Sequence, residues 1–141
     1  MPSIRERLLR ELVTRLATAI APVPVLRAPT VPVTRDASPA LLLFPESDAI
    51  TERPNARVDR LLTVRLVAIA RGADGEAVAD GLIVAAHAAL TADANLGGLA
   101  LGVQEVDCEW DAEDADAGAV ALPARYAIRY RTVANDLSIS G

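Results

Sequence analysis

The last third of the chain holds two stretches in which apolar and charged residues alternate strictly. Between residues 99 and 111 the alternating positions are the apolar Val106, Cys108 and Trp110 and the acidic Glu105, Asp107, Glu109 and Asp111. Between residues 124 and 132 they are the apolar Tyr126, Ile128 and Tyr130 and the basic Arg125, Arg129 and Arg131. Because side chains of a strand point alternately to its two sides, each stretch predicts a strand with one apolar and one charged surface.

We expect these two strands to pair as an antiparallel hairpin, with the apolar halves joining a core and the carboxylates lying opposite the guanidiniums. Opposite charges across a strand pair contribute roughly 0.2–1 kcal/mol each and help to define the register. On this interpretation Cys108 is a small buried residue. We call the predicted set the charged hairpin face, and it comprises Glu105, Asp107, Glu109, Arg125, Arg129 and Arg131.

Two other stretches have the period of an amphipathic helix. In residues 4–20 apolar side chains recur every four positions, and Ser3 and Glu6 have the spacing of a capping box. Pro22 and Pro24 end this helix. A second helix is predicted from about Glu76 to Leu90, and its buried side is formed by Val78, Leu82, Ala85, Ala86, Ala89 and Leu90.

Two apolar segments between the helices predict further strands. The first covers residues 40–44, and the second, residues 58–70, has apolar side chains on both sides, which is typical of a central strand covered on both faces. The polar connection between them, residues 46–57, exceeds the usual 2–5 residues of a hairpin loop. It is either disordered or an interaction loop for another subunit, and we predict the second, with Glu46, Asp48, Glu52, Arg53 and Arg57 as interface residues.

Together these elements predict one α+β domain over residues 1–141. The order helix, strand, strand, helix, strand, strand favours a single, mostly antiparallel sheet of about four strands with two main helices packed on it. The segment 22–39 is rich in proline and is expected to be extended and to lie against the rest of the protein without forming a full strand ladder.

Composition narrows the possible functions. The net charge of −5 argues against a nucleic-acid-binding surface, and all fourteen basic residues are arginine. A single cysteine excludes an internal disulfide and a cysteine cluster for zinc. No apolar stretch is long enough to cross a bilayer, and the N-terminal helix is too charged for a signal peptide, so we expect a soluble intracellular protein with no membrane partner.

No group of residues predicts catalysis, a cofactor or a metal. His87 is the only histidine, and no serine, cysteine or carboxylate has a recognisable spacing to it, so we expect a partly exposed surface residue. The acidic run 111–118 resembles a calcium loop only superficially, because Leu122 stands where the closing glutamate would be. Gly97 and Gly98 lack the lysine and the helix start of a phosphate loop.

Several features occur in an order that resembles a known family. They are the central strand 61–70, a helix with Ala79 and Asp80, the segment 89–100 with its Leu-Gly-Gly-Leu-Ala junction, and the closing segment 126–132 with Tyr-Arg-Thr. This order resembles the tail terminator, or tail completion, proteins of long-tailed bacteriophages and related gene transfer agents. The resemblance covers residues 40–136, and none of its motifs is a catalytic signature.

The resemblance implies a structural virion protein with an α/β fold, assembled in the host cytoplasm. Six copies would form a ring at the head-proximal end of the tail tube, stop tube polymerisation and present a surface for head joining. The implied partners are further copies of the chain, the tail tube protein and the head–tail connector, while the genome DNA passes through without specific binding. If Glu105, Asp107 and Glu109 line the channel, they would repel DNA; the alternative is that arginines pair with them.

Other functional classes remain open at this point. A head–tail connector, or neck protein, would share the place in the virion but would not cap tubes. A small ligand-binding module or an enzyme would act as a monomer or dimer with a pocket.

Overall fold

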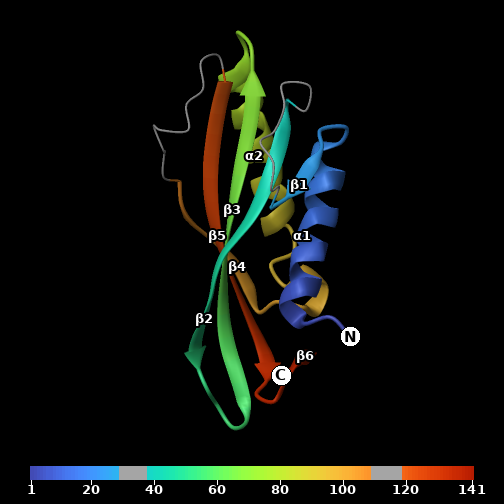
Figure 1. The fold of residues 1–141 in the computed structure, drawn as a ribbon, viewed down its shortest axis with the longest axis vertical. Helices are drawn as coiled ribbons and strands as arrows, with labels where there is room; N and C mark the ends of the chain where they lie inside the picture. Colours follow the sequence, from blue (N-terminus) through green and yellow to red (C-terminus); the bar gives the residue numbers. More distant parts are fainter. Residues whose placement is uncertain (29–37, 109–118) are drawn as a thin grey trace.

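The computed structural model describes residues 1–28, 38–108 and 119–141, and two helices and six strands make up most of them (Figure 1). In chain order the elements are α1 (Ile4–Ile20), β1 (Val25–Arg27), β2 (Ala40–Glu52), β3 (Arg57–Arg71), α2 (Gly75–Thr91), the short 3-10 helix η2 (Leu96–Gly98), β4 (Gly102–Asp107), β5 (Ala119–Val133) and β6 (Asp136–Ser140).

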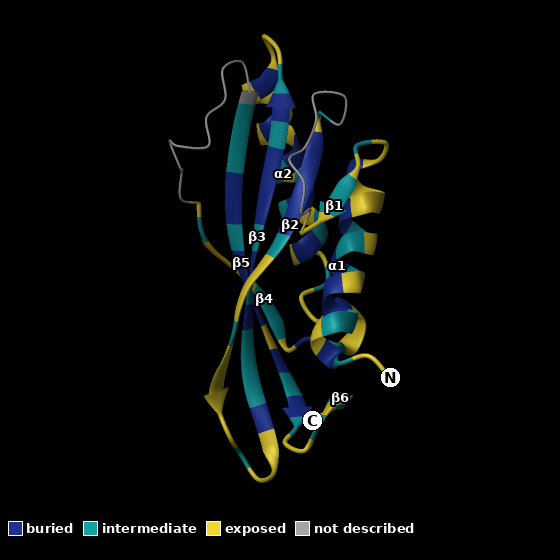
Figure 2. Cartoon of the chain, viewed as in Figure 1, coloured by how far each residue is buried: buried dark blue, intermediate teal, exposed yellow. Residues whose placement is uncertain are grey.

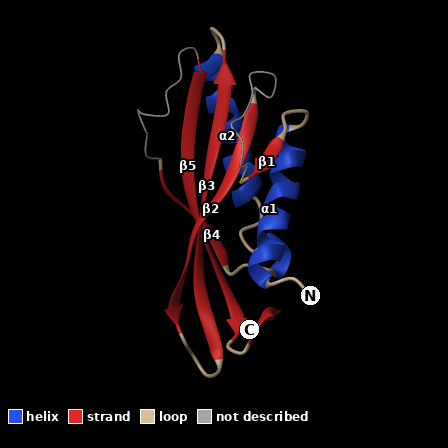
Figure 3. Ribbon diagram, viewed as in Figure 1, coloured by secondary structure: helices blue, strands red, loops and turns tan. Residues whose placement is uncertain are grey.

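The strands form one curled sheet in the order β1-β2-β3-β5-β4, with β6 paired to β5 (Figure 3). Every pairing is antiparallel except that of β1 with β2, which is parallel. The predicted α+β architecture is confirmed, and the described sheet has six strands where about four were expected. The two additional strands, β1 and β6, are only three and five residues long; β1 has no alternating pattern, and the alternation in β6 covers too few residues to predict a strand by itself.

Helix α1 forms where the sequence predicts it. The Ser3 hydroxyl accepts a hydrogen bond from the Glu6 backbone N–H at 3.1 Å, which caps the first turn. Such a cap contributes about 1 kcal/mol. The Glu6 carboxylate accepts hydrogen bonds from Arg27 and Arg10. The buried face of α1 consists of Ile4, Leu8, Leu9, Leu12, Leu16 and Ile20.

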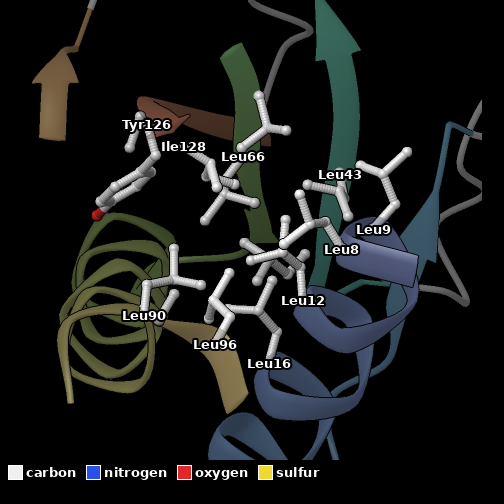
Figure 4. Packing of buried hydrophobic residues seen from close by; sticks show 14 of the residues in the cluster. Leu8, Leu9, Leu12, Leu16, Leu43, Leu66, Leu90, Leu96, Tyr126 and Ile128 are labelled. Carbon is white, nitrogen blue, oxygen red and sulfur yellow. The ribbon is translucent and has the colours of Figure 1, made fainter. Parts of the chain in front are cut away.

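The main core lies between the two helices and one face of the sheet (Figure 4). Leucines of α1, α2 and η2 meet alternate residues of β2, β3 and β5, among them Leu43, Leu66, Tyr126 and Ile128. Helix α2 buries Gly75, Ala79, Leu82, Ala86 and Leu90, so its small residues allow close packing on the sheet. The prediction that Val78 is buried is wrong, because this side chain lies outside the helix face that contacts the sheet.

β3 is a central strand, as predicted, but it is covered on both faces over only part of its length. Its even-numbered residues from Leu62 to Ala70 pack under the helices. On the other face Val67 packs with Ala40 and Leu42 of β2 in a second, smaller apolar cluster. Further toward the start of β3, Asp59 occupies this second face and pairs with an arginine of β5.

The prediction of a loop over residues 46–57 is wrong, because most of this segment is strand. β2 continues to Glu52 and β3 begins at Arg57, which leaves residues 53–56 as the turn. Register shifts in β2 lie between Pro45 and Ser47 and between Ile50 and Glu52. They interrupt the alternation of apolar and polar residues by which a strand is predicted from sequence. Residues 48–62, in which the end of β2 pairs with the start of β3, form a hairpin arm that reaches beyond the helices and ends in an exposed tip (Figure 2).

The proline-rich segment 22–39 is described only in part. Residues 25–27 form β1, which lies parallel to β2, so this part packs against the protein as expected. Its three paired residues agree with the prediction that the segment does not form a full strand ladder. Residues 29–37 lie outside the described part of the chain.

Candidate functional site

The two alternating stretches of the last third pair with each other, as predicted. β4 lies antiparallel to β5, and Asp107 stands opposite Arg125. The Arg125 guanidinium donates two parallel hydrogen bonds to the Asp107 carboxylate, from Nε at 2.7 Å and from Nη2 at 2.6 Å. This bidentate contact holds the pKa of Asp107 below its usual value and raises that of Arg125. Asp107 is therefore paired with an arginine, which agrees with the alternative to the hypothesis that this carboxylate repels DNA.

A row of four charges crosses the sheet on the face turned away from the helices. It consists of Glu46 on β2, Arg65 on β3, Arg125 on β5 and Asp107 on β4, and we call it the charged row. Arg125 Nη1 lies 3.2 Å from Glu46 Oε2, and Arg65 Nε lies 3.7 Å from Glu46 Oε1. Arg65 and Arg125 are direct neighbours across β3 and β5, so these carboxylates offset the repulsion between two like charges. The Arg65 guanidinium also lies over the Phe44 ring, 5.2 Å from its centre.

The prediction that Glu105 and Asp107 share a face of β4 is wrong. A register shift lies between them, which indicates a bulge, and the extra residue reverses the alternation. Glu105 stands opposite the core residue Tyr126, and its Oε2 lies 3.4 Å from His87 Nδ1 on α2. Asp107 points to the other face. Glu109 lies outside the described residues, as do Trp110 and the acidic run 111–118.

The same bulge overturns the predicted burial of the apolar side of β4. Val106 is 47% exposed, and Cys108 is an exposed residue instead of a buried one. The Cys108 thiol donates a hydrogen bond to the carbonyl of Pro123 on β5. Partial burial of the thiol and the negative charges of Asp107 and Glu105 raise the pKa of Cys108, which makes it a weak nucleophile at neutral pH.

Of the other two arginines of the charged hairpin face, Arg129 stands opposite Gly102 of β4, and Arg131 lies beyond the end of the β4 ladder. Arg131 donates to the Asp59 carboxylate through Nε and, at 3.2 Å, through Nη2. The hydrogen bond from Arg131, and to a lesser extent the charges of Arg131 and Arg129, lower the pKa of Asp59. The ladder of β4 reaches only to Arg129, so the end of β5 lies beyond the carboxylates with which it was expected to pair.

The predicted interface residues separate into two groups. Glu46 belongs to the charged row, and the Asp48 carboxylate accepts hydrogen bonds from the Tyr130 hydroxyl and, at 3.3 Å, from Arg5 of α1. The Asp48 side chain is only 10% exposed, so it ties the hairpin arm to the body of the protein. Glu52, Arg53 and Arg57 lie exposed at the tip of the arm.

His87 is half-buried, in agreement with the prediction of a partly exposed residue. Its Nδ1 lies 2.9 Å from the hydroxyl of Tyr126, which is fully buried. Burial and, next, the negative charge of Glu105 raise the pKa of Tyr126 to about 12. Sequence reasoning missed this contact because the two residues are thirty-nine positions apart and lie on different elements.

A second surface that the sequence analysis missed is the outward side of α2. Ala77, Gly81, Val84 and Ala88 recur there at helical spacing and are all exposed. We call these four residues the α2 face. Alanine and valine occur on all sides of this helix, so the sequence alone did not distinguish its exposed side clearly from its buried side. Glu76 and Asp80 flank the α2 face, four residues apart.

Within residues 1–28, 38–108 and 119–141, no cluster of three or more His, Cys, Asp or Glu side chains is arranged to hold a metal ion. None of the helices in the described ranges is both long and apolar enough to cross a bilayer. Neither protein-family models nor curated proteins gave a match to the chain.

Proposed function

We propose that the chain is a structural assembly protein, a tail terminator that forms a ring on the head-proximal end of a phage-type tail tube. The observation that carries this proposal is the hairpin arm, which reaches past the helices and ends in exposed charged residues. The arm extends beyond the helices with β5 paired to β3 along the same length, so its tip is exposed to a partner while its backbone remains hydrogen-bonded. Such an arm suits contact with a neighbouring subunit or with the tube.

The charged row supports the same role by holding the four strands that carry the arm. Charge-assisted contacts such as the bidentate Arg125–Asp107 pair add geometric specificity. A rigid sheet presents the arm in one orientation, and a head-to-tail contact between identical subunits closes into a ring only if its rotation is constant. Capping of the tube and joining of the head follow from the resemblance over residues 40–136.

Deletion of the gene tests this function directly. Without a terminator, tube subunits continue to add, so electron microscopy should reveal tails of uncontrolled length. Normal tails that fail to join heads would instead identify a head–tail connector and overturn the terminator role. Complete particles with normal tails would overturn both virion roles, and a plasmid copy of the intact gene serves as the control.

A further inference from the structure

The tip of the hairpin arm carries positive charge that the described part of the chain does not neutralise. Arg53 lies in the turn and Arg57 opens β3, and both are exposed. Neither guanidinium makes a hydrogen bond or an ion pair with another described residue, whereas most arginine side chains of the sheet do. Nearby on the arm, Ile50 is an apolar side chain that is 45% exposed. The tip therefore combines two cations without ion-pair partners and one carboxylate, Glu52, with an exposed apolar residue, so its net charge is positive.

The start of α2 has the complementary composition. Asp74, Glu76 and Asp80 are exposed, and none of them forms an ion pair with any residue in the described ranges. Beside them lies the α2 face, which has no charged residue and includes Val84 at 63% exposure. An acidic flank next to an apolar strip thus matches the basic, apolar tip of the arm.

These two surfaces lie at opposite ends of one strand. β3 runs from Arg57 at the tip to Arg71, just before α2 begins, and fifteen strand residues span roughly 45 Å. Figure 1 shows the hairpin turn at one end of the molecule and the start of α2 at the other. The two surfaces are too far apart to meet within one chain, so a second copy is the partner that offers each surface its complement.

Gly81 adds an independent observation in favour of a partner. It lies in the middle of α2, where glycine weakens a helix, and a Cβ placed on it would meet nothing within 4 Å. No packing among the described residues therefore requires glycine at this position. A missing side chain on an exposed helix face permits the backbone of another chain to approach closely.

We propose that the arm tip of one subunit docks on the α2 face of the next copy, with Arg53 and Arg57 near Glu76 and Asp80 and with Ile50 against Gly81 and Val84. This inference rests on the ring-forming part of the proposed function and names the two surfaces that meet. The contact joins two different patches, so it is heterologous, and repetition of it closes a ring or continues as a filament.

Paired charge reversals test the contact in a way that loss of folding cannot imitate. The first variant carries Arg53→Glu and Arg57→Glu, and the second carries Glu76→Arg and Asp80→Arg. In sedimentation velocity at low salt, each variant alone should self-associate roughly tenfold more weakly than the wild type, because like charges face each other. An equimolar mixture should recover association, since every arm tip then finds an α2 face of opposite charge.

The matched control carries Arg10→Glu and Arg129→Glu, which change two exposed arginines elsewhere and alter the net charge equally. It should associate like the wild type, and circular dichroism should give the folded spectrum for every variant. Wild-type-like association of both reversals, no recovery in the mixture, or equal loss in the control would each overturn the inference. A wild type that stays monomeric up to about 1 mM would do so as well.

A steric variant provides a second measurement. Gly81→Gln adds a side chain that points to solvent in the monomer, so the folded chain should tolerate it. We expect its self-association to weaken at least tenfold, whereas Thr91→Gln on the same helix should have no effect. If Gly81→Gln associates normally, the inference is wrong. Tails of uncontrolled length in the gene deletion would still support the terminator role in that case, so the two failures are distinguishable.

Discussion

At the scale of single residues, Glu6 not only lies in the capped first turn of α1 but also binds an arginine of β1. The Glu6 carboxylate accepts hydrogen bonds from Arg27 Nη1 at 2.6 Å and from Arg27 Nη2 at 2.7 Å, and it also accepts one from Arg10. The hydrogen bond from Arg27 is the main reason why the pKa of Glu6 falls from 4.5 to about 2. The residue therefore links α1 to β1 across twenty-one positions.

This lowered pKa predicts a pH-dependent share of the stability. A carboxylate with a folded pKa below its unfolded pKa stabilises the protein above the unfolded value, and the contribution is lost as the pH falls through the folded value. The free energy of unfolding should therefore decline between pH 4.5 and about 2 in part through Glu6. Glu6→Gln should lower stability at pH 7 and make this decline shallower, as measured by urea unfolding at several pH values.

Glu76→Gln is a suitable control for that experiment, because Glu76 has no cation partner among the described residues. It should leave the pH dependence of unfolding close to that of the wild type. An unchanged slope for Glu6→Gln would contradict the assignment to the Arg27 contact.

At the scale of elements, β5 pairs with β3 along the hairpin arm, and a side-chain contact ties β2 of the arm to the body of the protein. The Tyr130 hydroxyl of β5 donates to Asp48 of β2, and Arg5 of α1 reaches the same carboxylate. Tyr130 is almost fully buried, and its burial and the hydrogen bond to Asp48 raise its pKa. Three elements thus meet where the arm leaves the region covered by the helices.

Tyr130→Phe should lower the free energy of unfolding by about 2 kcal/mol, because hydrogen bonds to charged groups are among the stronger ones. The matched control is Tyr126→Phe on the same strand, whose hydroxyl contacts the His87 imidazole instead of a carboxylate. Its loss should be smaller. If both variants lose the same free energy of unfolding in urea, the hydrogen bond to Asp48 contributes no more to stability than the contact with His87.

Helix α2 offers a second prediction at this scale. Gly81→Ala should raise the free energy of unfolding by about 0.5–1 kcal/mol, because alanine is the better helix former and its Cβ meets no other atom. Gly75→Ala is the matched control, since a Cβ there would lie 3.3 Å from Val120 Cγ2. Chemical denaturation should show no comparable gain for Gly75→Ala. A loss of stability in Gly81→Ala would contradict the open surface at this position.

At the scale of the whole molecule, charge is distributed unevenly along the long axis. Cations without partners lie at the arm tip, and carboxylates without cation partners lie at the start of α2, as judged over the described residues. The charges between them are mostly paired, as in the charged row. The molecule therefore has ends of opposite sign, which favours head-to-tail association over a symmetric two-fold contact.

If these ends meet, self-association should weaken as salt is added. The screening length falls from about 10 Å at 0.1 M to about 3 Å at 1 M ionic strength, and exposed ion pairs are the contacts most affected. Sedimentation of the wild type across this range should reveal progressive dissociation. Association that does not respond to salt would indicate an apolar contact elsewhere on the surface.

The periodic patterns were sufficient to predict the fold class, both helices and the main strands, but not β1, β6 or the strand extensions over residues 46–57. Helix α1, the central β3 and the pairing of β4 with β5 are all visible in the spacing of apolar residues, because that spacing reflects which side of each element is buried. The side chains from which α2 and β5 build the core follow the same rule. Exceptions are Val78 of α2, Val106 of β4 and Cys108, which were expected to be buried and are exposed.

The spacing of residues alone was enough to predict both helices, the central strand β3, the pairing of β4 with β5 and a carboxylate opposite Arg125. Only the tertiary structure decided the bulge that separates Glu105 from Asp107, the arm formed from residues expected to be a loop, and the contacts of Glu6 and Asp48. The physical reason is that periodicity reports local burial along one element. A single inserted residue reverses that pattern, and the partner of a charged side chain depends on which distant segment the fold brings to it.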